Sequence, residues 1–271
     1  MRRHAAQLPA RRVPAHGGGG NPAGPGLLPL LALLTLWQLL APGPSAYFPA
    51  PFEWWRAALL LLDSGQLLPA FAATVTTFLE GLLLAVAIGV ALGIAIGTSR
   101  PIERALGPLL EFMRAIPPPV TVPIATLLLG YDVTMKLAVV ALSAIWPILL
   151  NTSSAAAHVE PLLRDVARTF RLSTVRWIRQ VVVPSVVPSI LLGIRVAIPL
   201  AIVVTLLVEM LTSLPGIGAL MIQSQRNFQS AQVYALLVVV GLFGFIVNDL
   251  FAIVEAIVLR RWPPRGVFRS G

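Results

Sequence analysis

Ionisable residues stand inside long apolar stretches of this 271-residue chain: Glu80, Glu111, Arg114, Arg195, Glu209 and Asp249. A charge inside a hydrocarbon layer is costly, so such residues commonly pair with an opposite charge or serve a solute pathway. Arg114 and Arg195 would favour an anionic solute, and Glu209 is the third pathway candidate. The alternative is structural pairing with a carboxylate, since Glu111 and Arg114 can meet on one helix face.

Motifs of enzyme chemistry are missing from the sequence. The chain has no cysteine, which excludes disulfides and cysteine-ligated metals. None of His4, His16 and His158 belongs to an HExxH pattern, so no catalytic zinc is expected. The only lysine, Lys136, lacks the glycine before it and the hydroxyl residue after it that a phosphate-binding P-loop requires. We therefore expect no catalytic residue, no metal and no cofactor in this chain.

The composition indicates a membrane protein. Hydrophobic residues make up 57% of the chain and charged residues 11%, against about 25% charged in a soluble domain. A helix needs roughly 20 apolar residues to cross the hydrocarbon layer. Apolar runs occur at 26–41, 68–98, 105–130, 137–150, 186–211 and 233–259. The sequence thus predicts an all-α polytopic transmembrane helical bundle with about six spans.

The first run has two interpretations. Pro44, Ser45 and Ala46 follow it and would suit a signal-peptide cleavage region. The basic stretch before the run is long for a signal peptide, so we favour a retained span. The predicted organisation is then a disordered basic cytoplasmic tail at 1–25, a transmembrane domain at 26–262 and a second cytoplasmic tail at 263–271.

The net charge of +9 follows the membrane topology. The arginines cluster at the ends of apolar runs and form no stripe with aromatic residues, so nucleic acid is not an expected partner. With the N-terminus inside, the predicted outer segments hold only Arg56, Lys136 and Arg226. The positive-inside rule therefore places both termini in the cytoplasm.

Prolines and glycines modify three of the predicted helices. Prolines at 117–119 and 123 interrupt the third run, so we expect a bent helix buried in the bundle. Residues 52–62, with Trp54 and Trp55, are typical of a short amphipathic helix at the membrane interface. Small residues in the second run permit close helix approach, either between two copies or within the chain: Gly81, Gly89, Gly93 and Gly97.

The segment 158–184 is polar and rich in arginine. Apolar residues recur at helical spacing as Leu162, Leu163, Val166 and Phe170, which predicts one apolar face on a charged helix. Such a helix lies on the membrane or docks into a partner's groove; a solvated basic loop is the alternative. Pro184 suits the first turn of the following span.

This segment resembles the permease signature of binding-protein-dependent ABC importers: Glu-Ala-Ala, three residues, Gly, nine residues, Ile, one residue, Leu-Pro. The spacing fits throughout, with Ala167 and Pro184 as the identical residues. Arg171 replaces the family glycine at a turn where positive φ or close packing is required. The matching positions are Asp165, Val166, Ala167, Arg171, Val181, Val183 and Pro184.

Further stretches are similar to the nitrate/sulfonate/taurine branch of these permeases: 114–124, 146–152 and 209–225. The resemblance covers about 46–264. It implies a multi-pass plasma-membrane subunit that works as a homodimer with a cytoplasmic ABC ATPase dimer, which binds ATP and magnesium. A coupling helix at about Pro161–Trp177 would dock in the ATPase. The implied coupling residues are Asp165, Val166, Ala167, Phe170, Arg171 and Pro184.

The resemblance also implies alternating access and a separate extracytoplasmic binding protein that touches 42–66 and 212–231. The cargo would be a small anion such as an aliphatic sulfonate, taurine or nitrate. A vitamin or pyrimidine precursor carried by the same kind of permease is an alternative. An ion-coupled secondary transporter is another, although it would show inverted repeats and paired carboxylates, and we see no repeat.

Overall fold

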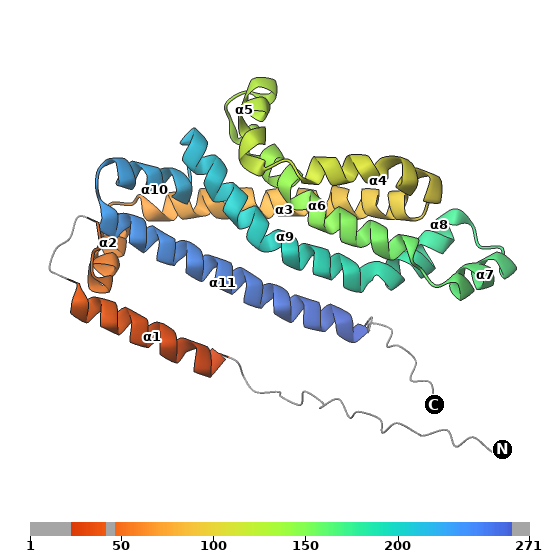
Figure 1. Ribbon diagram of the computed structural model, residues 1–271, viewed down its shortest axis with the longest axis horizontal. Coiled ribbons are helices and arrows are strands. Elements are labelled where there is room, and N and C mark those ends of the chain that lie inside the picture. The colour runs from red at the N-terminus through yellow and green to blue at the C-terminus, as the bar shows by residue number, and fades with distance from the viewer. Residues whose placement is uncertain (1–22, 42–46, 262–271) are drawn as a thin grey trace, which may run out of the picture.

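The computed structural model describes residues 23–41 and 47–261, and this part of the chain is helical without strands. The predicted all-α class is confirmed. Four helices are long and apolar enough to cross a membrane within this part. They run side by side along the molecule (Figure 1): α3 (Leu67–Gly97), α6 (Val133–Ala157), α9 (Val183–Thr212) and α11 (Ser230–Arg261).

The third apolar run forms a bent pair. Helix α4 (Arg100–Arg114) and helix α5 (Pro118–Leu129) meet at 97°. The helix is interrupted before Pro117, because a proline disfavours the helical conformation in the residue that precedes it. The predicted bend is confirmed, but the predicted burial is wrong. α4 has no buried residue and α5 buries only Val122, since α5 projects away from the bundle (Figure 1).

Counting the bent pair as one span gives up to five candidate spans in the described part of the chain. The first run forms α1 (Ala23–Leu40), whose apolar part, Leu28–Leu40, is shorter than a full span. The count of six therefore stays a prediction. α1 begins inside the predicted basic tail, and the rest of that tail and the whole of 263–271 lie outside the described residues.

Aromatic rings hold α1 at one end of the bundle. The Trp37 ring meets Trp54 of α2 (Pro51–Asp63) edge-on at 5.0 Å, and Trp54 stacks on Tyr234 of α11 at 5.1 Å. The Gln38 side chain also accepts a hydrogen bond from the Phe52 backbone N–H at 2.9 Å. Amphipathic aromatic side chains gather at membrane interfaces. α2 coincides with the predicted interfacial helix.

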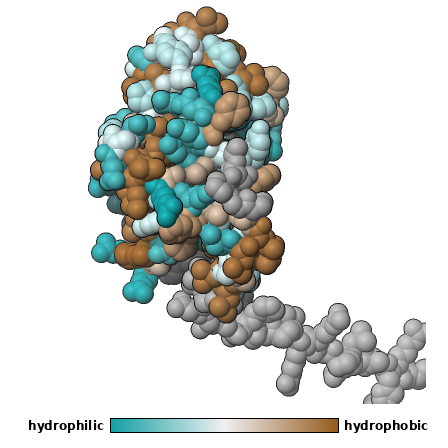
Figure 2. Space-filling view, turned by 90° about the vertical axis from the view of Figure 1, so that its left-hand side faces the viewer, coloured by the Kyte–Doolittle hydropathy of each residue, from teal (hydrophilic) through white to brown (hydrophobic). Residues whose placement is uncertain are grey.

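The two ends of the bundle carry the segments that the sequence assigns to opposite sides. α2 and α10 (Ile217–Arg226) lie at one end, while α7 (Pro161–Thr169) and α8 (Thr174–Trp177) lie at the other (Figure 1). Viewed from the first end, hydrophilic and hydrophobic residues alternate on the surface (Figure 2). The structure thus places α7 and α8 at the end opposite to α2 and α10, and the assignment of the α7 end to the cytoplasm stays a prediction.

The core is built on α6, which packs between α3 and α9. The small-residue stripe of α3 faces α6. A Cβ added at Gly89 would stand 3.2 Å from Ile148 Cβ, and one at Gly93 would stand 2.7 Å from Thr152 Cβ. The sequence left open whether these glycines pack between two copies or within the chain, and the structure shows packing within the chain.

We expect Gly93→Leu to lower the free energy of unfolding by about 1–3 kcal/mol, the usual cost of overpacking. Nothing lies within 4 Å of a Cβ at Gly241 of α11, so Gly241→Leu is the matched control and should leave stability nearly unchanged. Unfolding of both variants in mild detergent measures the difference. Equal stability would contradict the close α3–α6 contact.

Candidate functional site

The signature segment begins with α7. Pro161 occupies the first turn of this helix, where the absent N–H is not needed. Ala167 is buried toward the bundle and Leu163 packs beside it against Val159. Leu162 and Phe170 instead point outward, with 63% and 74% of their surfaces exposed. The apolar residues of this segment therefore lie on two faces of α7. One face packs against the bundle, and the other is exposed and could bind a partner.

A left-handed turn follows α7. Arg171 has φ 49°, and the Leu172 N–H donates to the Ala167 carbonyl at 3.0 Å, closing the helix end. Arg171, which occupies the position of the family glycine, thus adopts the left-handed backbone conformation that glycine favours. Left-handed backbone costs a non-glycine residue roughly 1–2 kcal/mol.

The predicted single helix over Pro161–Trp177 is wrong. α7 ends at Thr169 because a left-handed residue cannot continue a right-handed helix. α8 then starts at Thr174 and passes through one wider π turn, Ile178–Val182, into α9. Pro184 lies in the first turn of α9, as the sequence predicts.

Two of the pathway candidates are arginines with carboxylate neighbours. Arg114 lies 2.6 Å from Glu111 on α4, and both side chains are more than half exposed. Arg195 of α9 lies 3.2 Å from Glu255 of α11. These are pairings of the kind that the sequence left open. Glu80 and Asp249 are exposed on their helices.

A cavity of about 310 Å³ opens at the α4–α5 bend, between this bend, α6 and α9. Arg114 is the only charged residue on its wall, beside Thr121, Ser143 and Trp146. Both hydroxyls donate to carbonyls of their own helices, Thr121 to Pro118 and Ser143 to Val139. Neither Arg195 nor Glu209 lines this cavity. The cavity is thus mainly apolar, and its one cation is the arginine paired with Glu111.

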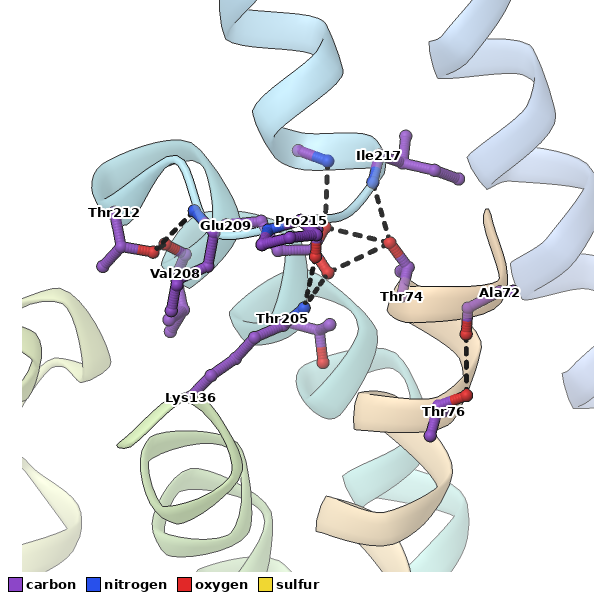
Figure 3. Close-up of polar contacts among 12 residues, drawn as sticks. Ala72, Thr74, Thr76, Lys136, Thr205, Val208, Glu209, Thr212, Pro215 and Ile217 are labelled. Carbon is purple, nitrogen blue, oxygen red and sulfur yellow. Dashed lines mark hydrogen bonds and ion pairs between the residues drawn. The ribbon is translucent and has the colours of Figure 1, made fainter. Parts of the chain in front are cut away.

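Glu209, the third candidate, is fully buried in a polar network at the α2–α10 end (Figure 3). Its carboxylate lies 2.6 Å from Lys136 Nζ, whose side chain is 3% exposed. Thr74 Oγ1 stands 3.0 Å from both carboxylate oxygens, and the Gly218 N–H donates at 2.9 Å. The buried charge is therefore paired and hydrogen-bonded, as burial requires.

The same network fixes the start of α10. Lys136 also donates to the Pro215 carbonyl at 2.9 Å, and the Ile217 N–H donates to Thr74 Oγ1 at 2.8 Å. The carboxylate from α9 thus sits at the N-terminus of α10, where negative charge is favoured. One cluster joins α3, α6, α9 and α10.

Close packing against α9 also explains two glycines in this turn. A Cβ at Gly216 would collide with the Glu209 carboxylate, and one at Gly218 would collide with the Leu206 carbonyl. Sequence reasoning placed Lys136 in an outer segment as a topology charge and missed its role. The available signal was the pairing of a lone lysine with a carboxylate at the outer end of another apolar run.

These features define a membrane-embedded helical transport subunit with an exposed α7 face at one end and a cavity at the α4–α5 bend. The chain belongs to the family described as "binding-protein-dependent transport system inner membrane component", whose model matches residues 85–262. It is thus an ABC importer permease, a multi-pass transport subunit of the plasma membrane and not an enzyme. The family implies an ATPase partner and a substrate-binding protein.

Relatives and solved structures agree with this assignment. The chain is 30% identical to the nitrate import permease protein NrtB of Synechocystis sp. over 85% of this chain and 87% of the relative. It is 29% identical to the bicarbonate transport system permease protein CmpB of Synechococcus elongatus over 86% of this chain and 90% of the relative. The inward-facing MetNI methionine ABC transporter shares the fold, with a TM-score of 0.65 and 13% identity over 72% of this chain and 97% of that chain.

Replacement of Arg171 by glycine tests the left-handed turn. We expect Arg171→Gly to raise the free energy of unfolding by about 0.5–1 kcal/mol, because relief of the left-handed backbone exceeds the entropic cost of glycine. Arg168→Gly, inside α7, should instead lower it by about 1 kcal/mol. Paired unfolding measurements check the sign, and a loss of stability in Arg171→Gly would contradict the turn.

Removal of Lys136 tests the buried network. Lys136→Met should lower the free energy of unfolding by about 3–5 kcal/mol, because it leaves the Glu209 carboxylate buried without its cation. Adding Glu209→Gln removes that charge and should recover most of the loss. Unfolding of the single and double variants measures this coupling. Arg226→Gln, exposed on α10, is the control, and additive effects of the two substitutions would refute the pairing.

Proposed function

We propose that this permease carries a small oxyanion, of which nitrate and bicarbonate are the first examples to test, with sulfonates and taurine next. The observation that carries the proposal is Arg114, the single charge on the wall of the cavity at the α4–α5 bend. The relatives named for nitrate and bicarbonate import support an anionic cargo. The cavity forms at the bend because the axes of α4 and α5 diverge there by 97°.

In the proposed mechanism, the partner ATPase subunit binds and hydrolyses ATP, and this chain does neither. The outward face of α7, with Leu162, Val166 and Phe170 exposed, is our candidate for the contact with the ABC ATPase. Exposed apolar side chains on a short charged helix are the usual anchors of helix-in-groove recognition. ATP and magnesium bound to an ATPase dimer would move two copies of this chain between inward-open and outward-open states.

Purification of the complex tests the coupling. The tagged chain is isolated from native membranes in mild detergent, and co-purifying proteins are identified by mass spectrometry. We expect an ATPase subunit in about equal amount with the wild type, and its loss with Phe170→Asp, because a desolvated carboxylate is costly in an apolar groove. Ile102→Asp, an exposed apolar position on α4, is the control. Retention of the ATPase by Phe170→Asp would place the contact elsewhere.

Uptake measurements test the cargo. In cells that hold the complete transporter, Arg114→Gln should reduce nitrate or bicarbonate uptake by about tenfold, since a hydrogen bond to a charged group contributes about 1.5–3 kcal/mol. ATPase co-purification should be unchanged. Arg195→Gln, whose arginine lies outside the cavity, is the matched control. Unaltered uptake by Arg114→Gln, or transport restricted to neutral solutes, would refute the oxyanion proposal while leaving the permease role intact.

A further inference from the structure

A second cavity, of about 330 Å³, lies at the opposite end of the bundle from Glu209. Its wall is formed by α7, by α8 and by the residue that follows α3. The polar residues on the wall are Thr98, Arg164, Arg168, Thr174 and Trp177. No carboxylate lines it, so the wall carries positive charge only.

Hydrogen-bond donors dominate this wall. Arg164 is half-buried, and it takes part in none of the four ion pairs found between described residues. The nearest carboxylate to Arg168 is Asp165 at 3.7 Å, with both side chains largely exposed. The Thr98 hydroxyl already donates to the Ile94 carbonyl at 2.7 Å. Two guanidinium groups, with the indole N–H of Trp177 and the hydroxyl of Thr174, therefore place several hydrogen-bond donors around one cavity.

The cavity faces the bundle and not the outward face of α7. Its wall includes Ala167, the residue of α7 that is buried toward the bundle. Leu162 and Phe170, the proposed ATPase contacts, do not line it. The occupant of this cavity must therefore approach beside the bundle, between α7 and the end of α3.

In a bilayer, the ends of the candidate spans beside this cavity would lie near the lipid head groups. Thr98 directly follows the last residue of α3, a candidate membrane span, and Trp177 precedes the π turn that leads into α9. Tryptophan at a span end is typical of the lipid interface. Basic pockets at this depth on the cytoplasmic side suit lipid phosphates, and arginine matches phosphate oxygens in a bidentate geometry.

We propose that this cavity binds a phosphate group, supplied by the head group of an anionic phospholipid of the same leaflet. Arg164 and Arg168 hold the phosphate oxygens, and Trp177 and Thr174 complete the set of donors. The bound lipid would attach α7 to the membrane end of α3. This proposal depends neither on the cargo nor on the outward face of α7, and Ala167 is the one residue that the cavity wall shares with the implied coupling residues.

Lipid retention tests the proposal. The full-length chain is purified with its associated subunits, placed in nanodiscs of equal parts phosphatidylglycerol and phosphatidylcholine, and released into native mass spectrometry. We expect the wild type to retain phosphatidylglycerol in preference to phosphatidylcholine. Arg164→Gln should lower the retained ratio of the two lipids by about tenfold, because it removes one charge-assisted hydrogen bond. Arg168→Gln should weaken it too. Arg104→Gln, an exposed arginine on α4 outside the cavity, is the control.

A second arm separates the two sources of phosphate. Inorganic phosphate is titrated into the same proteins in phosphatidylcholine nanodiscs while thermal unfolding is followed. Stabilisation that depends on Arg164, without retention of phosphatidylglycerol, would keep the phosphate site and assign it to free phosphate. If neither retention nor stabilisation changes in Arg164→Gln and Arg168→Gln, while both variants unfold like Arg104→Gln, the proposal is overturned.

Discussion

The burial of one carboxylate organises the α2–α10 end of the bundle. Glu209 has no exposed surface, and an isolated charge in such a place would be prohibitively unstable. Its stability depends on Lys136, on Thr74 and on a backbone N–H of α10 (Figure 3). These groups come from different helices, so α3, α6, α9 and α10 must keep a fixed relative position for the charge to remain satisfied.

Close packing supplies the complementary constraint along the rest of the bundle. Where α3 meets α6, glycines bring the helices so near that a methyl group at Gly93 would collide with Thr152 and one at Gly89 would crowd Ile148. In a bilayer, where apolar burial provides little driving force between helices, such contact gives the dispersion energy that holds helices together. α4 and α5 lack this packing, and they form the bend that carries Arg114. The rigid part and the cavity are thus adjacent but built differently.

The α7 end combines an anchor with an exposed surface. Ala167 and Leu163 attach α7 to the bundle, and Arg171 turns the chain back at a left-handed residue. This turn orients the helix so that Leu162 and Phe170 face outward while Arg164 faces the second cavity. A force applied to α7 by a partner would pass through α8 and the π turn directly into α9, the helix that also carries Glu209.

Features that depend on local chemistry and on the bilayer could be read from the amino-acid sequence. The apolar runs specify the long helices, because the hydrocarbon layer demands about 20 apolar residues for each crossing. The prolines at 117–119 specified the bend, and the spacing of Asp165, Ala167 and Pro184 identified the family.

Which side chains meet, in contrast, depends on the tertiary structure. Lys136 and Glu209 are far apart in the chain, and their pairing depends on how α6 and α9 pack. The same packing decided that the α3 glycines serve the chain's own core, that Arg114 and not Glu209 borders the cavity, and that the coupling segment breaks at Arg171. Local patterns report propensity and burial, whereas the distance between remote residues is set by the whole bundle.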